Sequence, residues 1–320
     1  MFSDQRAELN LPLARAAIDR DYLSRSRPEL FDELWADPQT RVLVMYDGKV
    51  LLHQQDAHPS AELKLLAVDQ VTSAKFRVYL GKSTIASAYE PFDTPIVLAV
   101  LSKNAADNIE NNEAAWHHLR KSGAGLGVRD AGLFTQGLAL ANWHESHQYC
   151  SRCGTPTVIE QGGWVRRCFN DDFETYPRTD PAVIVAIIDD NDRILLGSQG
   201  VWEENRWSIL AGFVEPGESL NAAVEREMFE EAGVRVTQIE YLGSQAWPFP
   251  HTLMFGFSAR ATGGQIELAD GLEIEKLRWF SRQELEAEAS DLLLPGRISI
   301  ARSLIENWYG KEIISRAELA

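Results

Sequence analysis

Glutamates and glycines are concentrated in one segment, GFVEPGESLNAAVEREMFEEAGV, which spans residues 212–234. If the second half of this segment is helical, Glu227, Glu230 and Glu231 fall within about one turn of each other. Carboxylate oxygens gathered in this way are the ligands that Mg²⁺ or Mn²⁺ prefers. A metal site beside a glycine-rich loop suits hydrolytic chemistry on phosphate groups.

The ends of this helix are marked by local signals. Ser219 is a good N-cap, and Glu218 places a negative charge beside the positive end of the helix dipole. Gly233 is a good residue for the left-handed stop that follows a helix. We therefore expect a helix that begins after Ser219 and ends before Gly233.

One face of the expected helix is apolar, with Leu220, Val224 and Met228 in a single stripe. Glu231 falls in the middle of this stripe and Glu227 at its edge. An unpaired carboxylate on a buried face is costly, and a bound cation would remove the conflict. The alternative is a solvated acidic face, which leaves the glycines, Arg226 and the stripe without explanation.

The segment resembles the Nudix box, G-x5-E-x7-R-E-U-x-E-E-x-G-U with U aliphatic. Every fixed position is matched, by Gly212, Glu218, Arg226, Glu227, Met228, Glu230, Glu231, Gly233 and Val234. The resemblance implies a loop–helix–loop on an α/β/α sandwich, and hydrolysis of a nucleoside diphosphate linked to another group. It also implies metal binding by Glu227, Glu230 and Glu231, with Glu218 and Arg226 orienting them.

A second segment, SQAWPFPHT at residues 244–252, narrows the substrate. It resembles the SQPWPFPxS signature of the NADH pyrophosphatases, the NudC-type Nudix hydrolases, with Ala246 in place of the usual proline. The resemblance implies hydrolysis of NAD(H) to AMP and nicotinamide mononucleotide, and some members of the subfamily remove NAD caps from RNA. Substrate contacts are expected from Gln245, Trp247 and Phe249.

The same resemblance implies roles for three more residues. Phe213 aligns with an aromatic that stacks on nicotinamide, and Tyr176 with an aromatic supplied by the partner subunit of a homodimer. Glu273 aligns with a glutamate that completes the metal site, although spacing alone does not separate it from Glu275. In the expected mechanism a metal-activated water attacks one phosphorus, with Glu230 or Glu273 as the general base.

Two alternatives stay open from the sequence. One is a Nudix hydrolase of another nucleoside diphosphate derivative, such as ADP-ribose, against which the SQAWPFPHT segment argues. The other is a silent Nudix domain used for binding. The set of glutamates is complete, and one of them lies in an apolar stripe. Both observations argue against a site that has lost its catalytic activity.

A cysteine pattern upstream predicts a metal site of another kind. Cys150 and Cys153 form a C-x-x-C, followed by Cys168, which is three-quarters of a zinc ribbon. The position of the fourth cysteine holds Asp171, which can bind zinc. His147 is another candidate, and a ribbon held by packing alone is the third alternative. Any zinc here would be structural.

These sites need elements to position them, and we expect three parts: an N-terminal α+β domain (1–125), a helix with a zinc-ribbon-like module (126–178) and a Nudix α/β/α sandwich (179–320). The fold class is therefore mixed α+β and α/β. A hairpin with a type I′ turn is expected at 41–52, and a buried strand at 95–101. Helices are expected at 107–121, 130–143, 220–232 and 295–309, and strands at 182–188, 193–197, 207–214, 238–243, 252–260 and 276–280.

Composition limits the class of protein. The 320 residues carry a net charge of -16, which does not attract nucleic-acid backbones in general. No apolar run is long enough to span a bilayer, and the first residues lack the pattern of a secretory signal. Three cysteines, two of them in a C-x-x-C, favour reduced thiols and a cytoplasmic location.

Overall fold

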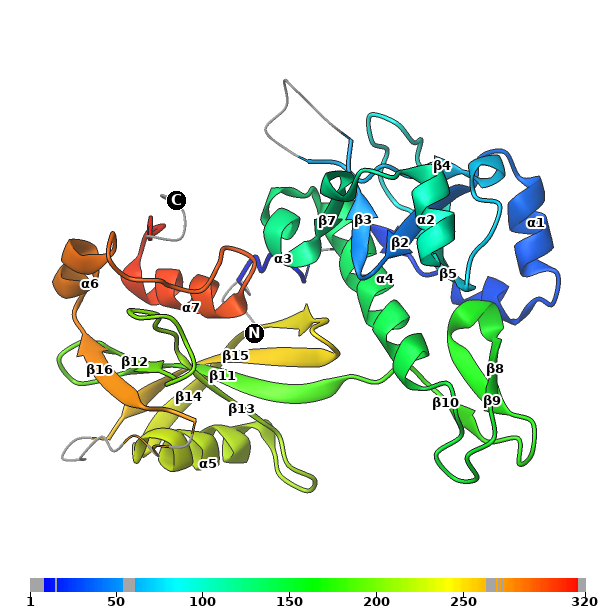
Figure 1. Ribbon diagram of the computed structural model, residues 1–320. Coiled ribbons are helices and arrows are strands. Elements are labelled where there is room, and N and C mark those ends of the chain that lie inside the picture. The colour runs from blue at the N-terminus through cyan, green and yellow to red at the C-terminus, as the bar shows by residue number, and fades with distance from the viewer. Residues whose placement is uncertain are drawn as a thin grey trace, which may run out of the picture. The chain divides into compact units, whose positions relative to one another are not determined.

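The computed structural model describes residues 9–14, 16–53, 61–262, 269, 271 and 273–315. The chain forms two compact units (Figure 1). The first, which we call the C-terminal unit, comprises residues 1–14, 180–246 and 252–320. The second, the N-terminal unit, comprises residues 15–179 and 247–251.

The C-terminal unit is built on a six-stranded sheet. Its strand order is β14-β15-β11-β12-β16, and β13 pairs with β11. The two central strands, β11 and β15, are parallel, while β12 and β13 run antiparallel to β11. The strands are β11 (Asp180–Ile188), β12 (Ile194–Ser198), β13 (Leu210–Phe213), β14 (Val236–Trp247), β15 (Thr252–Ala261) and β16 (Lys276–Phe280).

Helices cover both faces of this sheet, because side chains of β11 alternate between two cores. Val183 and Val185 pack with α5 (Leu220–Ala232), whereas Ile184 and Ala186 pack with α7 (Ile300–Tyr309). Figure 1 shows α5 and α7 on opposite sides of the strands. The short α6 (Arg282–Glu288) follows β16. The expected α/β/α sandwich is confirmed.

Residues 9–14 belong to this unit, although the sequence placed them in the N-terminal domain. The Leu9 amide donates to the Leu242 carbonyl at 3.0 Å, and Leu11 is buried in the core under α7. No local signal in the sequence predicts this, because the segment packs against strands more than 200 positions later in the chain.

The N-terminal unit contains a seven-stranded sheet in the order β1-β5-β6-β2-β3-β7, with β4 paired to β2. The predicted hairpin is confirmed: Asp47 (φ 51°) and Gly48 (φ 68°) are both left-handed, as a type I′ turn requires. The strands are β1 (Ile18–Asp19), β2 (Arg41–Tyr46), β3 (Lys49–Leu51), β4 (Leu66–Ala67), β5 (Phe76–Ser83), β6 (Pro95–Val100) and β7 (Trp116–His118).

The long helix α4 (Val128–Ser146) covers one face of this sheet. A Cβ at Gly137 would lie 3.3 Å from Leu43 and 3.5 Å from Leu98, so the glycine lets the helix approach β2 and β6 closely. We expected this helix to belong with the zinc-ribbon module, whereas it packs on the N-terminal sheet. Two further helices of the unit are α1 (Leu30–Ala36) and α2 (Lys103–Ile109).

Two helix predictions are wrong in extent. Instead of one helix over 107–121, α2 ends at Ile109, and Trp116–His118 pair with β3 before the short α3 (Leu119–Ser122). The pairing of β7, with Trp116 buried in the core, overrides helical propensity. The predicted helix at 295–309 begins only at Ile300, because the Ser299 side chain caps it there.

The zinc-ribbon module of the N-terminal unit is a three-stranded antiparallel sheet of β10, β9 and β8. These strands are β8 (Thr157–Glu160), β9 (Val165–Cys168) and β10 (Glu174–Thr175). In the described part of the chain, none of the helices combines the length and apolar character needed to cross a bilayer.

Candidate active site and zinc-ribbon cluster

The helix of the glutamate segment, α5, has the predicted ends. The Ser219 hydroxyl accepts a hydrogen bond from the Ala222 amide at 3.2 Å, and Gly233 (φ 65°) terminates the helix in the left-handed conformation. Its inner face is fully buried at Val224 and Met228. Glu231 shares this face and is only 5% exposed, whereas Glu230 is exposed. The structure therefore places a carboxylate where packing alone would select an apolar residue.

Arg226 connects the other acidic residues of the segment. Its guanidinium donates to both carboxylate oxygens of Glu218, at 2.6 and 3.2 Å, and to Glu230 at 3.0 Å. It lies 2.9 Å from Glu227 and donates to the Phe213 carbonyl at 2.9 Å. A planar cation with five donors can hold several carboxylates in fixed positions at once.

The electrostatics of this cluster differ from residue to residue. The hydrogen bond from Arg226 lowers the pKa of Glu218. Burial raises the pKa of Glu227, and the negative charges of Glu230 and Glu273 raise it further, although Arg226 acts in the opposite direction. The carboxylates of Glu230 and Glu273 therefore add negative charge around Glu227, and a divalent cation bound there would neutralise this charge.

Gly212 makes room for one of these carboxylates. A Cβ at this position would lie 1.9 Å from the carboxylate carbon of Glu227, far inside van der Waals contact. The backbone cannot easily move away, because Gly212 pairs with Val183 in the sheet. The first glycine of the segment is thus a cradle for Glu227, a role that its spacing alone did not reveal.

Glu273 and Glu275 line an open cavity of about 520 Å³ in the same unit, together with Gln199, Gly200 and Val201. The two glutamates are not equivalent. The charge of Glu273 acts on Glu227, whereas a Cβ at Gly200 would lie 2.9 Å from a carboxylate oxygen of Glu275. This geometry supports Glu273 over Glu275 as the residue that joins the carboxylate cluster.

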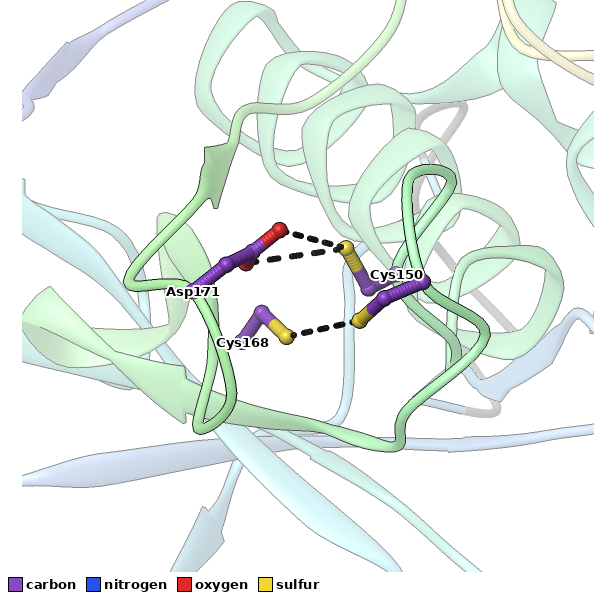
Figure 2. Close-up of side chains that lie close together, drawn as sticks. Cys150, Cys168 and Asp171 are labelled. Carbon is purple, nitrogen blue, oxygen red and sulfur yellow. Dashed lines mark hydrogen bonds between the residues drawn. The ribbon is translucent and has the colours of Figure 1, made fainter.

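A second cluster lies in the N-terminal unit. One ligand atom from each of Cys150, Cys153, Cys168 and Asp171 lies within 4.8 Å of all the others. Figure 2 shows Asp171 pointing at Cys150, with an Sγ to Oδ1 distance of 3.9 Å. The sulfurs of Cys153 and Cys168 are 3.5 Å apart, and neither cysteine is in a disulfide. His147 is not part of this group of four.

Two matched loops build the cluster. In the first, the Arg152 amide donates to Cys150 Sγ at 3.4 Å, and the amide of Gly154 (φ 73°) donates to the Cys150 carbonyl at 2.9 Å. This loop presents Cys150 and Cys153 on the same side.

The second loop repeats the same pattern around Cys168. The Asn170 amide donates to Cys168 Sγ at 3.4 Å, and the amide of Asp172 (φ 54°) donates to the Cys168 carbonyl at 3.1 Å. Asp171 therefore stands in the second loop where Cys153 stands in the first. Three sulfurs and one carboxylate are an acceptable tetrahedral donor set for zinc.

Comparisons with known proteins match three consecutive segments of the chain to family models. Residues 178–301 match the NUDIX domain, residues 145–176 the NADH pyrophosphatase zinc ribbon domain, and residues 39–143 the NADH pyrophosphatase-like rudimentary NUDIX domain. The chain belongs to the Nudix family. The third match includes most of α4, in agreement with the packing of this helix on the N-terminal sheet.

Two curated relatives of this Nudix protein are similar in sequence. The NAD-capped RNA hydrolase NudC of Mycobacterium tuberculosis H37Rv is 43% identical over 187 residues, which cover 55% of this chain and 59% of that protein. The NAD-capped RNA hydrolase NUDT12 of Homo sapiens is 37% identical over 197 residues, which cover 57% of this chain and 42% of that protein. The matched region is therefore less than two thirds of either relative.

The two aromatics expected to stack on substrate are both accessible. Phe213 ends β13 of the Nudix domain, and its side chain is 58% exposed. Tyr176 follows β10 of the zinc ribbon and is 60% exposed. The Tyr176 hydroxyl donates to Glu174 at 2.6 Å, which leaves the face of the ring open.

Gln245 has a different environment from the one expected of a substrate contact. It is 1% exposed, its carbonyl accepts from the Leu13 amide at 3.1 Å, and its amide donates to the Ile298 carbonyl at 2.9 Å. This geometry supports a packing role, in which Gln245 ties residues 9–14 and the segment just before α7 to β14 of the Nudix domain.

Trp247, the last residue of β14, and Phe249 group with the N-terminal unit rather than with the rest of β14 and with β15. Their rings meet edge to face at 4.9 Å, and the Arg120 guanidinium lies 3.9 Å from the Phe249 centroid. The Asn142 amide donates to the carbonyls of Pro248 and Pro250. The segment that contains this tryptophan and phenylalanine is thus held by residues of α3 and α4.

Proposed function

We propose that this Nudix protein hydrolyses the pyrophosphate bond of NAD(H), giving AMP and nicotinamide mononucleotide. The observation that carries the proposal is the buried Glu231 on the inner face of α5, beside a carboxylate cluster that Arg226 holds in place. The names of the two relatives and the SQAWPFPHT segment support a dinucleotide substrate. An NAD-capped RNA end is a second substrate that the relatives' names support.

The donor set fits a divalent metal. Glu227, Glu230, Glu231 and Glu273 offer only hard oxygen ligands, and Gly212 leaves the space that the Glu227 carboxylate occupies. Mg²⁺ or Mn²⁺ bound there would supply positive charge to the pyrophosphate oxygens and acidify a water molecule.

The protein's own groups have separate roles in this proposal. Arg226 and Glu218 fix the carboxylates of the helix, which reduces the reorganisation needed at the moment of reaction. Glu230 and Glu273 are both exposed and are the two candidates to accept the proton of the attacking water. Phe213, exposed at the end of β13, would stack on the nicotinamide ring.

We also propose that the protein acts as a homodimer in which Tyr176 reaches the partner's substrate. The exposure of its ring is the supporting observation, since a large aromatic on a surface is typical of contact with another molecule. Sedimentation equilibrium would give the mass of one chain rather than two if this proposal is wrong.

The experiment that tests the function compares NADH, NAD⁺, ADP-ribose and NAD-capped RNA, each with Mg²⁺ or Mn²⁺, and identifies products by mass. We expect AMP and nicotinamide mononucleotide from NADH or NAD⁺, and slower release of AMP from ADP-ribose. Preferential cleavage of ADP-ribose would favour a Nudix hydrolase of another substrate. AMP absent from every reaction would favour a binding module.

We further propose that the second cluster holds one structural Zn²⁺ through Cys150, Cys153, Cys168 and Asp171. The two matched loops support it, because amide-to-sulfur hydrogen bonds stabilise thiolates in a ligand geometry. The hydrogen bond with Thr155 lowers the pKa of Cys153 to about 7, which favours its thiolate near neutral pH. Zinc-binding thiols must be reduced, which supports a cytoplasmic location.

Asp171→Asn is expected to release this zinc. The asparagine keeps the shape of the side chain but removes the negative charge that a zinc ligand supplies, so we expect zinc content to fall well below one per chain. Metal analysis after dialysis measures this, and the melting temperature should fall with the metal. Asp172→Asn in the same loop is the matched control. Equal zinc in wild type and Asp171→Asn would remove Asp171 from the site.

A further inference from the structure

An open cavity of about 510 Å³ lies within the N-terminal unit, where the loop 247–251 meets α3 and α4. Leu119, Leu138, Phe249 and two prolines form its apolar wall. The wall is fixed in place, because the Asn142 amide donates to the carbonyls of Pro248 and Pro250 at 3.1 and 3.0 Å. Its volume is within the range of small-molecule sites.

The polar side of this cavity is basic. Arg120 and Lys121 supply its positive charge, whereas burial lowers the pKa of His118, which also lines the cavity, so that its ring is neutral near pH 7. No aspartate or glutamate is among the described lining residues. Such a concentration of positive charge is unexpected in a chain of net charge -16. The neighbouring Asp47 is 3.3 Å from Lys49, so its charge is already compensated.

The Arg120 side chain is held against two aromatic rings, and no described carboxylate forms an ion pair with it. Its guanidinium lies 3.9 Å from the Phe249 centroid and 5.0 Å from that of Trp247. Neither Arg120 nor Lys121 forms an ion pair with a carboxylate in the described part of the chain. A cation held on an aromatic face, with a lysine next to it and an apolar wall opposite, suits a ligand with a phosphate at one end and a flat ring at the other.

We propose that this cavity binds a nucleoside 5′-monophosphate, with the phosphate on Arg120 and Lys121 and the ring against Phe249 and the leucines. AMP and nicotinamide mononucleotide share this chemistry, and both would be products of the proposed reaction. The site uses none of the carboxylates of the Nudix domain, so it does not depend on the proposed function.

The test is calorimetric titration of the full chain, in buffer without added Mg²⁺ or Mn²⁺, with four probes: AMP, nicotinamide mononucleotide, adenosine and inorganic phosphate. We expect one site per chain for AMP or nicotinamide mononucleotide, and at least about tenfold weaker binding of adenosine and of phosphate, since each lacks half of the ligand. The two nucleotides compared with each other identify which product is preferred.

Variants locate the site. Lys121→Gln and Arg120→Gln should each weaken binding at least about tenfold, whereas Lys103→Gln, an exposed lysine of α2, should not. Lys121 is exposed, so its variant is expected to keep the fold. Unchanged binding by the Lys121 and Arg120 variants would overturn the proposal, as would adenosine binding as tightly as AMP. Loss of binding in Glu231→Gln would assign the nucleotide to the Nudix site instead, whatever the hydrolytic activity.

Discussion

Glu231→Gln is expected to fold normally and to lose at least about a hundredfold in turnover of the pyrophosphate substrate. The carboxylate is 5% exposed on the inner face of α5, so its charge has no benefit for solubility. An amide of the same shape removes the negative charge but keeps the packing against Val224 and Met228.

Turnover at saturating Mg²⁺ and Mn²⁺, together with a Mn²⁺ titration, measures this effect. Glu225→Gln is the matched control, because Glu225 is an exposed glutamate on the same helix. Its turnover should remain within about twofold of wild type. Near-normal turnover in Glu231→Gln would contradict the assignment of Glu231 as a metal ligand.

Gly212→Ala is expected to lower turnover about a hundredfold by displacing Glu227 rather than by removing it. The new methyl group would lie 1.9 Å from the Glu227 carboxylate carbon, and strand pairing with Val183 prevents the backbone from retreating. The side chain must therefore leave its position. We expect a destabilisation of about 1–3 kcal/mol, as for other overpacked sites.

Two further variants show whether the loss of turnover comes from displacement of Glu227 or from a general effect of adding a methyl group. Gly296→Ala should be neutral, since no atom lies within 4 Å of the added methyl group. The double variant Gly212→Ala with Glu227→Ala should regain stability in urea unfolding but not turnover. A single Gly212→Ala variant with wild-type turnover would show that Glu227 works from another position.

The glutamate-bearing helix α5 could be predicted in detail because its signals are local. A serine N-cap, a glycine stop and an apolar stripe specify where α5 begins, ends and faces, so the burial of Glu231 followed from its position in that stripe. The hairpin at 41–51 was predictable for the same reason, since Asp47-Gly48 adopts the left-handed pair of the turn.

Interactions between distant segments were not predictable in this way. The helix expected over 107–121 is interrupted because Trp116–His118 pair with a strand that begins at Lys49. We expected Gln245 to contact substrate, but its side chain is buried and hydrogen-bonds to Leu13 and to Ile298, just before α7. Each partner is remote in sequence, so no spacing rule could include it.

The sequence by itself predicted the carboxylates of this Nudix protein and the faces of α5 on which they lie, because spacing along one helix decides which residues share a face. It also placed three cysteines where a zinc ribbon needs them. Only the tertiary structure decided that Asp171 completes the second loop, that Gly212 accommodates Glu227 and that Arg120 lies on Phe249. These contacts join separate elements, and packing rather than local propensity selects them.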